Sequence, residues 1–193
     1  MIIVFAKAPG QAKTRLVPRL GASGAARLHM RLVRHAVRTA RAAACGPVEL
    51  HVTRNHSLFS GEVRLQRGRD LGERMRNAFA RARKPAILIG SDCPALAPTD
   101  LRRAWRWLRG GCDAVLAPAE DGGYALIALR FPIRKIFEDV AWGGPRVYAD
   151  TVEKLQGYRW RALRTLWDID RPEDLDRLRS LRFSAASRPR ARR

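Results

Sequence analysis

The chain has 193 residues and a formal net charge of +20, from 38 Lys and Arg residues against 18 Asp and Glu residues. This length suits one domain with an ordinary core, which excludes any need for stapling by disulfides or a structural metal. The three cysteines, Cys45, Cys93 and Cys112, form no CxxC pair, so we expect buried thiols in a reducing compartment and no zinc site. No apolar run reaches the roughly 18 residues of a membrane span. With no signal-peptide pattern after Met1, we expect a soluble, cytoplasmic protein.

The first half of the chain predicts two strands and two helices, with one uncertain segment between them. Residues 2–6 read as a buried strand. A helix capped by Ser23 follows and ends at Cys45-Gly46-Pro47, and residues 49–53 form the next strand. Residues 57–68 carry mixed signals, with a possible short strand at 63–66. Asp70-Leu71-Gly72 opens a helix that runs to about Arg83.

The second half continues the alternation of strands and helices. We expect strands at 86–90, 113–117, 124–129 and 160–166, and helices from Pro98 to Gly110, at 148–155 and at 172–181. Such alternation predicts a single α/β domain of Rossmann-like, three-layer architecture, with helices covering a mostly parallel sheet. We assign residues 1–182 to this domain and residues 183–193 to a basic, disordered tail.

The positive charge raises the hypothesis of nucleic-acid binding. However, the arginines are spread along helices, lysine is scarce and alanine is abundant, as the composition bias of a GC-rich genome would produce. The tail, Arg188-Pro189-Arg190-Ala191-Arg192-Arg193, is too short to define a function. We therefore expect at most weak contact between the basic surface and a nucleic acid.

Carboxylates gather where predicted strands end. Asp92 directly follows the strand at 86–90, Asp121 precedes the strand at 124–129, and Asp168 and Asp170 follow the last strand. Ligands of open α/β sheets bind at the carboxyl ends of the strands. Asp92 is therefore the first candidate ligand for Mg²⁺ or Mn²⁺, which bind through one or two carboxylates plus phosphate oxygens. Asp168 and Asp170 are candidates for the second carboxylate, although capping of the next helix explains them as well, and Asp121 is a further option.

A basic loop follows the first strand. It contains Lys7, Lys13 and Arg15, with a turn at Pro9-Gly10 whose backbone N–H groups can approach an anion. The segment is not a Walker loop, because Ala8 stands where that loop needs glycine. Two interpretations stay open, a diphosphate-binding loop and a solvated basic turn. Gly122-Gly123 likewise indicates either close passage of the backbone beside a ligand or a plain turn.

Five motifs in this order resemble the DUF2064 family, also labelled the selenodomain- or arsenosugar-associated transferase family, within the GT-A glycosyltransferase superfamily. They are Lys7-Ala8-Pro9 with Lys13-Thr14-Arg15-Leu16, Asp70-Leu71-Gly72-Glu73-Arg74-Met75, Gly90-Ser91-Asp92-Cys93-Pro94, Pro118-Ala119-Glu120-Asp121-Gly122-Gly123-Tyr124, and Asp168-Ile169-Asp170-Arg171-Pro172-Glu173-Asp174-Leu175. The resemblance implies a GT-A fold, a nucleotide held over the first loop and a divalent metal at Asp92. It also implies that Asp70 and Gly72 lie beside the base or ribose and Asp168 near the second metal position.

The leading hypothesis is a metal-dependent glycosyltransferase that uses a nucleoside diphosphate sugar and a small acceptor. A metal held by Asp92, together with the cations Lys13 and Arg15, would stabilise the diphosphate leaving group, and Asp121 would serve as base or orient the acceptor. Lys7, Pro9, Gly10, Arg15, Gly122 and Gly123 would surround the phosphates. One alternative is nucleotidyl transfer from an NTP to a small phosphorylated acceptor, with release of pyrophosphate. The other is a noncatalytic module that binds nucleotides or nucleic acid.

Overall fold

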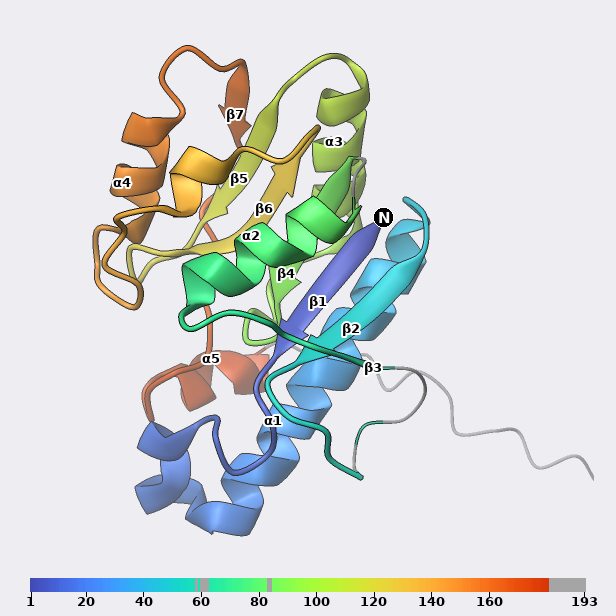
Figure 1. Cartoon of the computed structure of the whole chain (residues 1–193). Helices are drawn as coiled ribbons and strands as arrows, with labels where there is room; N and C mark the ends of the chain where they lie inside the picture. Colours follow the sequence, from blue (N-terminus) through green and yellow to red (C-terminus); the bar gives the residue numbers. More distant parts are fainter. Residues whose placement is uncertain (58, 60–62, 83–84, 181–193) are drawn as a thin grey trace, which may run out of the picture.

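The computed structural model describes residues 1–57, 59, 63–82 and 85–180, and in this part of the chain seven strands form one sheet (Figure 1). The strands lie in the order β3-β2-β1-β4-β6-β5-β7, and only β6 runs antiparallel to its neighbours. Their bounds are β1 Ile2–Ala6, β2 Val48–Val52, β3 Val63–Leu65, β4 Ala86–Gly90, β5 Ala114–Pro118, β6 Tyr124–Leu129 and β7 Trp160–Ala162. The sheet is therefore mostly parallel, as the sequence predicts.

Helices cover both faces of the sheet. Helices α1 (Val17–Ala43) and α3 (Pro98–Arg109) pack on one face. Helix α2 (Leu71–Ala82), the 3₁₀ turn η2 (Arg134–Phe137) and the region of α4 (Val147–Lys154) pack on the other, with α2 in front of the sheet in Figure 1. The 3₁₀ turn η1 (Thr14–Leu16) and the short helix α5 (Asp174–Ser180) lie beyond the lower end of β1 and β4 in the same view.

Strand periodicity explains these layers. Successive side chains of a strand point to opposite faces. In β1, Ile2 and Val4 join the cluster against α1 and α3, whereas Ile3 and Phe5 join the cluster against α2. All five residues of β1 are buried, as expected for a central strand covered on both faces. Strands β1 and β4 are thus packed on both faces up to the point where the loops that carry Lys13 and Asp92 begin.

Most boundaries differ from the sequence-based prediction by about one residue, and three differ more. Helix α1 begins at Val17 instead of after Ser23, because Pro18 lies at a helix start, and the helix is kinked at Gly21 (φ 68°). Strand β7 ends at Ala162, and residue Leu166 forms only an isolated parallel bridge with Ala119. The last helix begins at Asp174, two residues later than predicted.

Some expectations fall on residues that the structure does not describe. The end of the second predicted helix at Arg83 and the proposed tail at 183–193 lie outside the described residues, as does part of the uncertain segment at 57–68. In the described part of the chain, no helix is both long and apolar enough to cross a membrane.

Candidate active site

The loop after β1 is held in place by side chains from two other elements. The Thr53 hydroxyl accepts a hydrogen bond from the Ala8 backbone N–H and donates one to the Gln11 side chain, both at 2.9 Å. The Gln11 N–H closes a turn on the Ala8 carbonyl at 3.1 Å, and Gly10 within this turn has φ 82°. Only glycine adopts such a φ without strain. The loop therefore has a defined course before any ligand binds.

His29 of α1 holds the same loop through a contact with the Lys7 backbone. Its Nε2 lies 2.8 Å from the carbonyl oxygen of Lys7, so this nitrogen carries the proton and donates. The side chain is buried, and burial lowers the pKa of the imidazole. Its Nδ1 is a buried acceptor with no hydrogen-bond partner among the described residues. A lone polar residue on the apolar face of a helix is the sequence signal that could have indicated such a supporting contact.

Lys13 places its ammonium group against the carboxylate that follows β4. Its Nζ lies 2.9 Å from Asp92 Oδ2 and also donates to the Ile169 carbonyl oxygen. The Lys13 side chain is 1% exposed, whereas that of Asp92 is 41% exposed. Lys13 has a left-handed backbone (φ 61°), which is uncommon for a residue with a side chain and recurs at functional sites. A buried, fixed cation thus faces an accessible carboxylate.

Asp168 lies close to two further carboxylates. Burial and the negative charges of Asp121 and Asp92 raise the pKa of Asp168 to about 6, against a smaller lowering by Lys13. Asp121 is exposed, and its Oδ1 accepts a hydrogen bond from the Gly123 N–H at 2.9 Å. Like charges held together in this way favour either a shared proton or a bound cation. The structure therefore gathers Lys13, Asp92, Asp121 and Asp168 from four separate parts of the chain.

Backbone hydrogen bonds bring these segments together. The Ile169 N–H donates to the Asp92 carbonyl at 3.0 Å, and the Glu120 N–H donates to the Leu166 carbonyl at 3.0 Å. The segment that carries Asp168 is consequently fixed between the end of β4 and the turn between β5 and β6.

Arg15 and Asp170 form an exposed ion pair with each other. Both were predicted to act on ligands, Arg15 on phosphate and Asp170 on metal. The Asp170 N–H and the Arg171 N–H donate to the Asp174 carboxylate, at 2.9 and 2.7 Å, so the first residue of α5 holds the segment that leads into the helix. The side chain of Lys7 is exposed and Pro9 is buried.

Asp70 lies at the start of the helix that the sequence predicts, and Gly72 and Gly122 have packing roles that the sequence did not reveal. Asp70 Oδ1 accepts the Glu73 N–H at 2.8 Å and so caps α2. A Cβ atom on Gly72 would lie 2.3 Å from the Trp142 Nε1, and one on Gly122 would lie 1.9 Å from the Pro145 carbonyl oxygen. Both glycines therefore allow the segment 137–148 to pack closely. Cys93 is buried as predicted, which raises the pKa of its thiol to about 12 and disfavours a thiolate nucleophile.

A divalent cation fits this group of residues only together with a ligand. The described residues contain no cluster of three or more His, Cys, Asp or Glu side chains that could hold a metal alone. Mg²⁺ and Mn²⁺ commonly take one or two carboxylates and complete their shell with phosphate oxygens and water. The exposed carboxylate of Asp92 and the charge-crowded carboxyl of Asp168 are hard oxygen donors of this kind.

Comparison with known proteins identifies related chains. Residues 27–144 match the family described as "Uncharacterized protein conserved in bacteria (DUF2064)". A protein from Desulfovibrio desulfuricans G20, named as a proposed nucleotide-diphospho-sugar transferase, is 30% identical with a TM-score of 0.86, over 95% of this chain and 88% of its own. No curated protein matches the sequence.

More distant solved structures share the fold. A CMP:2-keto-3-deoxy-manno-octonic acid synthetase in complex with CTP aligns with a TM-score of 0.62 at 12% identity, over 94% of this chain and 97% of its own. A nucleotidyl transferase from Methanothermobacter aligns with a TM-score of 0.61 at 17% identity, over 93% and 95%. Rv0371c from Mycobacterium tuberculosis H37Rv, solved with manganese, aligns with a TM-score of 0.50 at 17% identity, over 92% and 97%. The predicted fold class is confirmed.

Proposed function

The chain belongs to the DUF2064 family, and we propose that it is a metal-dependent glycosyltransferase that moves a sugar from a nucleoside diphosphate to a small acceptor. The observation that carries the proposal is the buried ammonium group of Lys13, 2.9 Å from Asp92 and close to the carboxyl of Asp168, which in turn lies close to Asp121. A diphosphate carries several negative charges close together and so needs several positive charges around it. Lys13 supplies one, and the accessible carboxylate oxygens could hold a metal ion that supplies the others. The 30% identical chain named as a proposed nucleotide-diphospho-sugar transferase supports the same class.

Each residue has a role in this proposal. Breakage of the bond between the sugar and the diphosphate leaves an electron pair on a diphosphate oxygen, and Lys13 stabilises that charge without reorganisation because it is already held in place. Asp92 and Asp168 would hold Mg²⁺ or Mn²⁺, which when bound adds positive charge beside the diphosphate. Asp121 accepts the proton of the acceptor hydroxyl as its oxygen bonds to the sugar. Gly10 lets the loop backbone approach the phosphates, with Lys7 at its exposed start.

Nucleotidyl transfer is the second candidate, because solved structures of the same fold include a nucleotidyl transferase and a protein in complex with CTP. In that reaction an acceptor phosphate would attack the α-phosphorus of an NTP, and pyrophosphate would carry away the charge that Lys13 stabilises. The products separate the two reactions, since glycosyl transfer releases a nucleoside diphosphate. A module that binds nucleic acid only would show a steep salt dependence and would not respond to changes at Asp92 and Asp168.

A thermal-shift screen tests the proposal. The protein is mixed with UDP-, GDP-, ADP- and CDP-sugars or with NTPs, with and without Mn²⁺. A ligand at 100 times its dissociation constant stabilises by about 2.7 kcal/mol, which corresponds to a rise of roughly 5–10 °C for a chain of this size. Lys13→Ala should abolish the rise, whereas Lys154→Ala on α4 should keep it. Full metal-dependent turnover by Asp92→Asn would overturn the assignment.

A further inference from the structure

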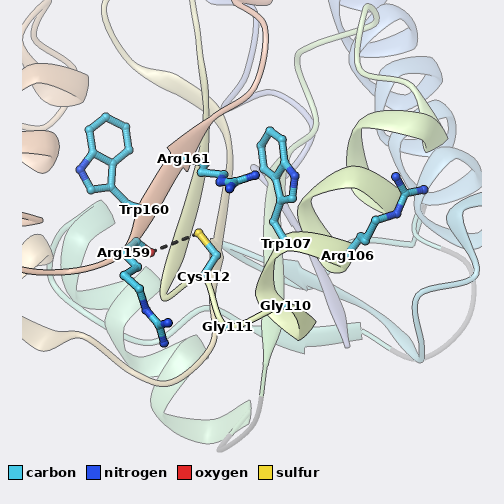
Figure 2. A pocket seen from close by; sticks show the side chains of 8 residues that line it. All are labelled: Arg106, Trp107, Gly110, Gly111, Cys112, Arg159, Trp160 and Arg161. Carbon is cyan, nitrogen blue, oxygen red and sulfur yellow. Dashed lines mark hydrogen bonds between the residues drawn. The ribbon is translucent and has the colours of Figure 1, made fainter.

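A pocket lies at the opposite end of the sheet from Lys13. Its volume is about 430 Å³. It lies at the amino end of β7, which pairs with the start of β5 through Ala114 and Trp160, and at the carboxyl end of α3. Figure 2 shows the residues that line it, which are Arg106, Trp107, Gly110, Gly111, Cys112, Arg159, Trp160 and Arg161. None of these residues belongs to the candidate active site.

The lining of this pocket is cationic and contains no carboxylate. Elsewhere in the molecule arginines pair with acids, as Arg130 does with Asp113 and Arg164 with Asp100. Within the described residues, Arg106, Arg159 and Arg161 form no ion pair. Asp113 accepts the Arg159 backbone N–H and forms its ion pair with Arg130 at 2.5 Å, although the Arg159 charge also lowers its pKa. The lining thus includes three arginines without an ion pair, of which Arg161 points toward Trp107 and Arg106 extends away from them along α3 (Figure 2).

Two of these guanidinium groups are held by neutral contacts. The Arg161 guanidinium lies over the Trp107 ring, 5.2 Å from its centre, as Figure 2 shows. The Arg159 guanidinium lies over Gly111, where an added Cβ would be 3.4 Å from its nearest nitrogen. The Cys112 thiol donates to the Arg159 carbonyl at 3.1 Å and so fixes the start of β7. Contacts with an aromatic ring and a glycine do not neutralise the positive charge of a guanidinium group. Both groups therefore remain available to bind an anion.

From these observations we infer that the pocket binds a small oligophosphate anion. Guanidinium groups match phosphate oxygens in pairs, and more than one of them in the lining suits a ligand with more than one anionic group. The volume falls in the range of small-ligand pockets. The side chains of Trp107 and Trp160 offer apolar walls on which a nucleobase could lie. The shared chemistry is the oligophosphate, whether inorganic or the tail of a nucleotide, and it does not depend on the proposed function.

Indole N–H signals from ¹⁵N-labelled tryptophan provide a local readout. Trp107 and Trp160 line this pocket, whereas Trp142 contacts Gly72 and Trp167 precedes Asp168 at the other end of the sheet. Titration of the Lys13→Ala protein with pyrophosphate should shift the Trp107 and Trp160 signals with saturation. Shifts confined to Trp142 and Trp167, or no shift at millimolar pyrophosphate and ADP, would overturn the inference.

Charge-matched variants separate a built pocket from general attraction to a basic protein. Arg159→Gln with Arg161→Gln should weaken binding about tenfold or more, the loss expected when charge-assisted phosphate contacts are removed. Arg34→Gln with Arg103→Gln removes the same two charges from exposed positions on α1 and α3 and should leave the affinity within about twofold. Equal losses in the two double variants would contradict a defined site.

The identity of the anion follows from a comparison of ligands. Equal affinities for pyrophosphate and ADP would indicate that the phosphates alone are recognised, and tighter binding of ADP would indicate a nucleotide whose base lies against the tryptophans. Both results support the pocket. Shifts that appear only with single-stranded oligonucleotides, and never with pyrophosphate or ADP, would reject it in favour of a nucleic-acid surface.

Discussion

Lys13 differs from an ordinary surface lysine in both its burial and its partners. Its side chain is 1% exposed, and its ammonium group is shared between the Asp92 carboxylate and the Ile169 carbonyl. A lysine in water must be desolvated and ordered when it meets a phosphate, whereas this one has already lost its water on folding. Removal of the ammonium group would leave the Ile169 carbonyl without its donor, so Lys13→Ala should lower stability as well as binding. The Lys154→Ala control and a measured unfolding midpoint separate the two effects.

Asp168 predicts an unusual pH dependence of stability. Because its pKa rises from 3.8 to about 6 in the folded protein, the unfolded chain releases this proton first as the pH increases. The free energy of unfolding should therefore fall between these two values and level off above them. Asp168→Asn removes the ionisation and should be more stable than the natural protein at neutral pH, and about equally stable near the acidic end of this range.

Urea denaturation in the presence of EDTA measures this difference without bound metal. The difference in free energy of unfolding between Asp168→Asn and the natural protein should grow through the range from 3.8 to about 6. A constant difference across that range would show that Asp168 has its ordinary pKa. Asp170→Asn is the matched control, because the Asp170 carboxylate is paired with Arg15 and is not crowded by other acids. The same pH-dependent difference should therefore be absent in this variant.

At the scale of elements, the turn between β5 and β6 depends on Gly122. This residue has φ 88°, and a Cβ atom would lie 1.9 Å from the Pro145 carbonyl oxygen, which cannot move as a flexible side chain would. Gly157 has nearly the same φ of 84° but no atom within 4 Å of the added Cβ. The two glycines therefore separate backbone strain from steric clash.

Gly157→Ala should lower the free energy of unfolding by about 1 kcal/mol, the cost of a left-handed backbone for a residue with a side chain. Gly122→Ala should lower it by at least about 2 kcal/mol more, because the segment at Pro145 must shift. Denaturant unfolding of both variants gives the comparison. Equal losses of free energy in the two variants would mean that the segment at Pro145 shifts at no measurable cost.

The elements with strong periodicity could be predicted from the sequence, whereas their ends and pairings could not. Buried strands such as Ile2–Ala6 and Ala86–Gly90 are apolar throughout, and the structure confirms both. The prediction placed the start of α1 at Ser23, just after the kink at Gly21, and missed the helical segment upstream of the kink, where Pro18 lies at the helix start. The early end of β7 depends on its pairing with β5 at the edge of the sheet, which no local pattern specifies.

At the scale of the whole molecule, the candidate site is formed by loops that are distant in the sequence and that lie side by side because of the order of the strands in the sheet. Residue types and strand ends indicated Lys13, Asp92 and Asp168 as candidates, because the carboxyl ends of parallel strands lie at one edge. The pairing of Arg15 with Asp170 and the packing of Trp142 on Gly72 depend on contacts between distant segments. Sequence patterns report a residue's neighbours along the chain, so these alternatives to ligand binding could not be predicted.

Ile169 joins this site to the rest of the protein. Its N–H donates to the Asp92 carbonyl, its carbonyl accepts from Lys13, and its buried side chain packs with Leu16 and Leu28. Ile169→Ala should lower the free energy of unfolding by about 2–5 kcal/mol, the usual range for such a core truncation. It should also loosen the loop that carries Lys13, because the apolar cluster positions Leu16, whose N–H donates to the Lys13 carbonyl at 3.0 Å.

Amide hydrogen exchange distinguishes this local effect from a general loss of stability. Leu163→Ala serves as the matched control, since Leu163 lies in the same segment of the chain and is 7% exposed, but packs in the cluster against α1 and α3. Exchange at the Leu16 amide should accelerate in Ile169→Ala and stay near its natural rate in Leu163→Ala, under conditions where both proteins are folded. Equal acceleration in the two variants would show that the loop after β1 is no more dependent on Ile169 than on the core as a whole.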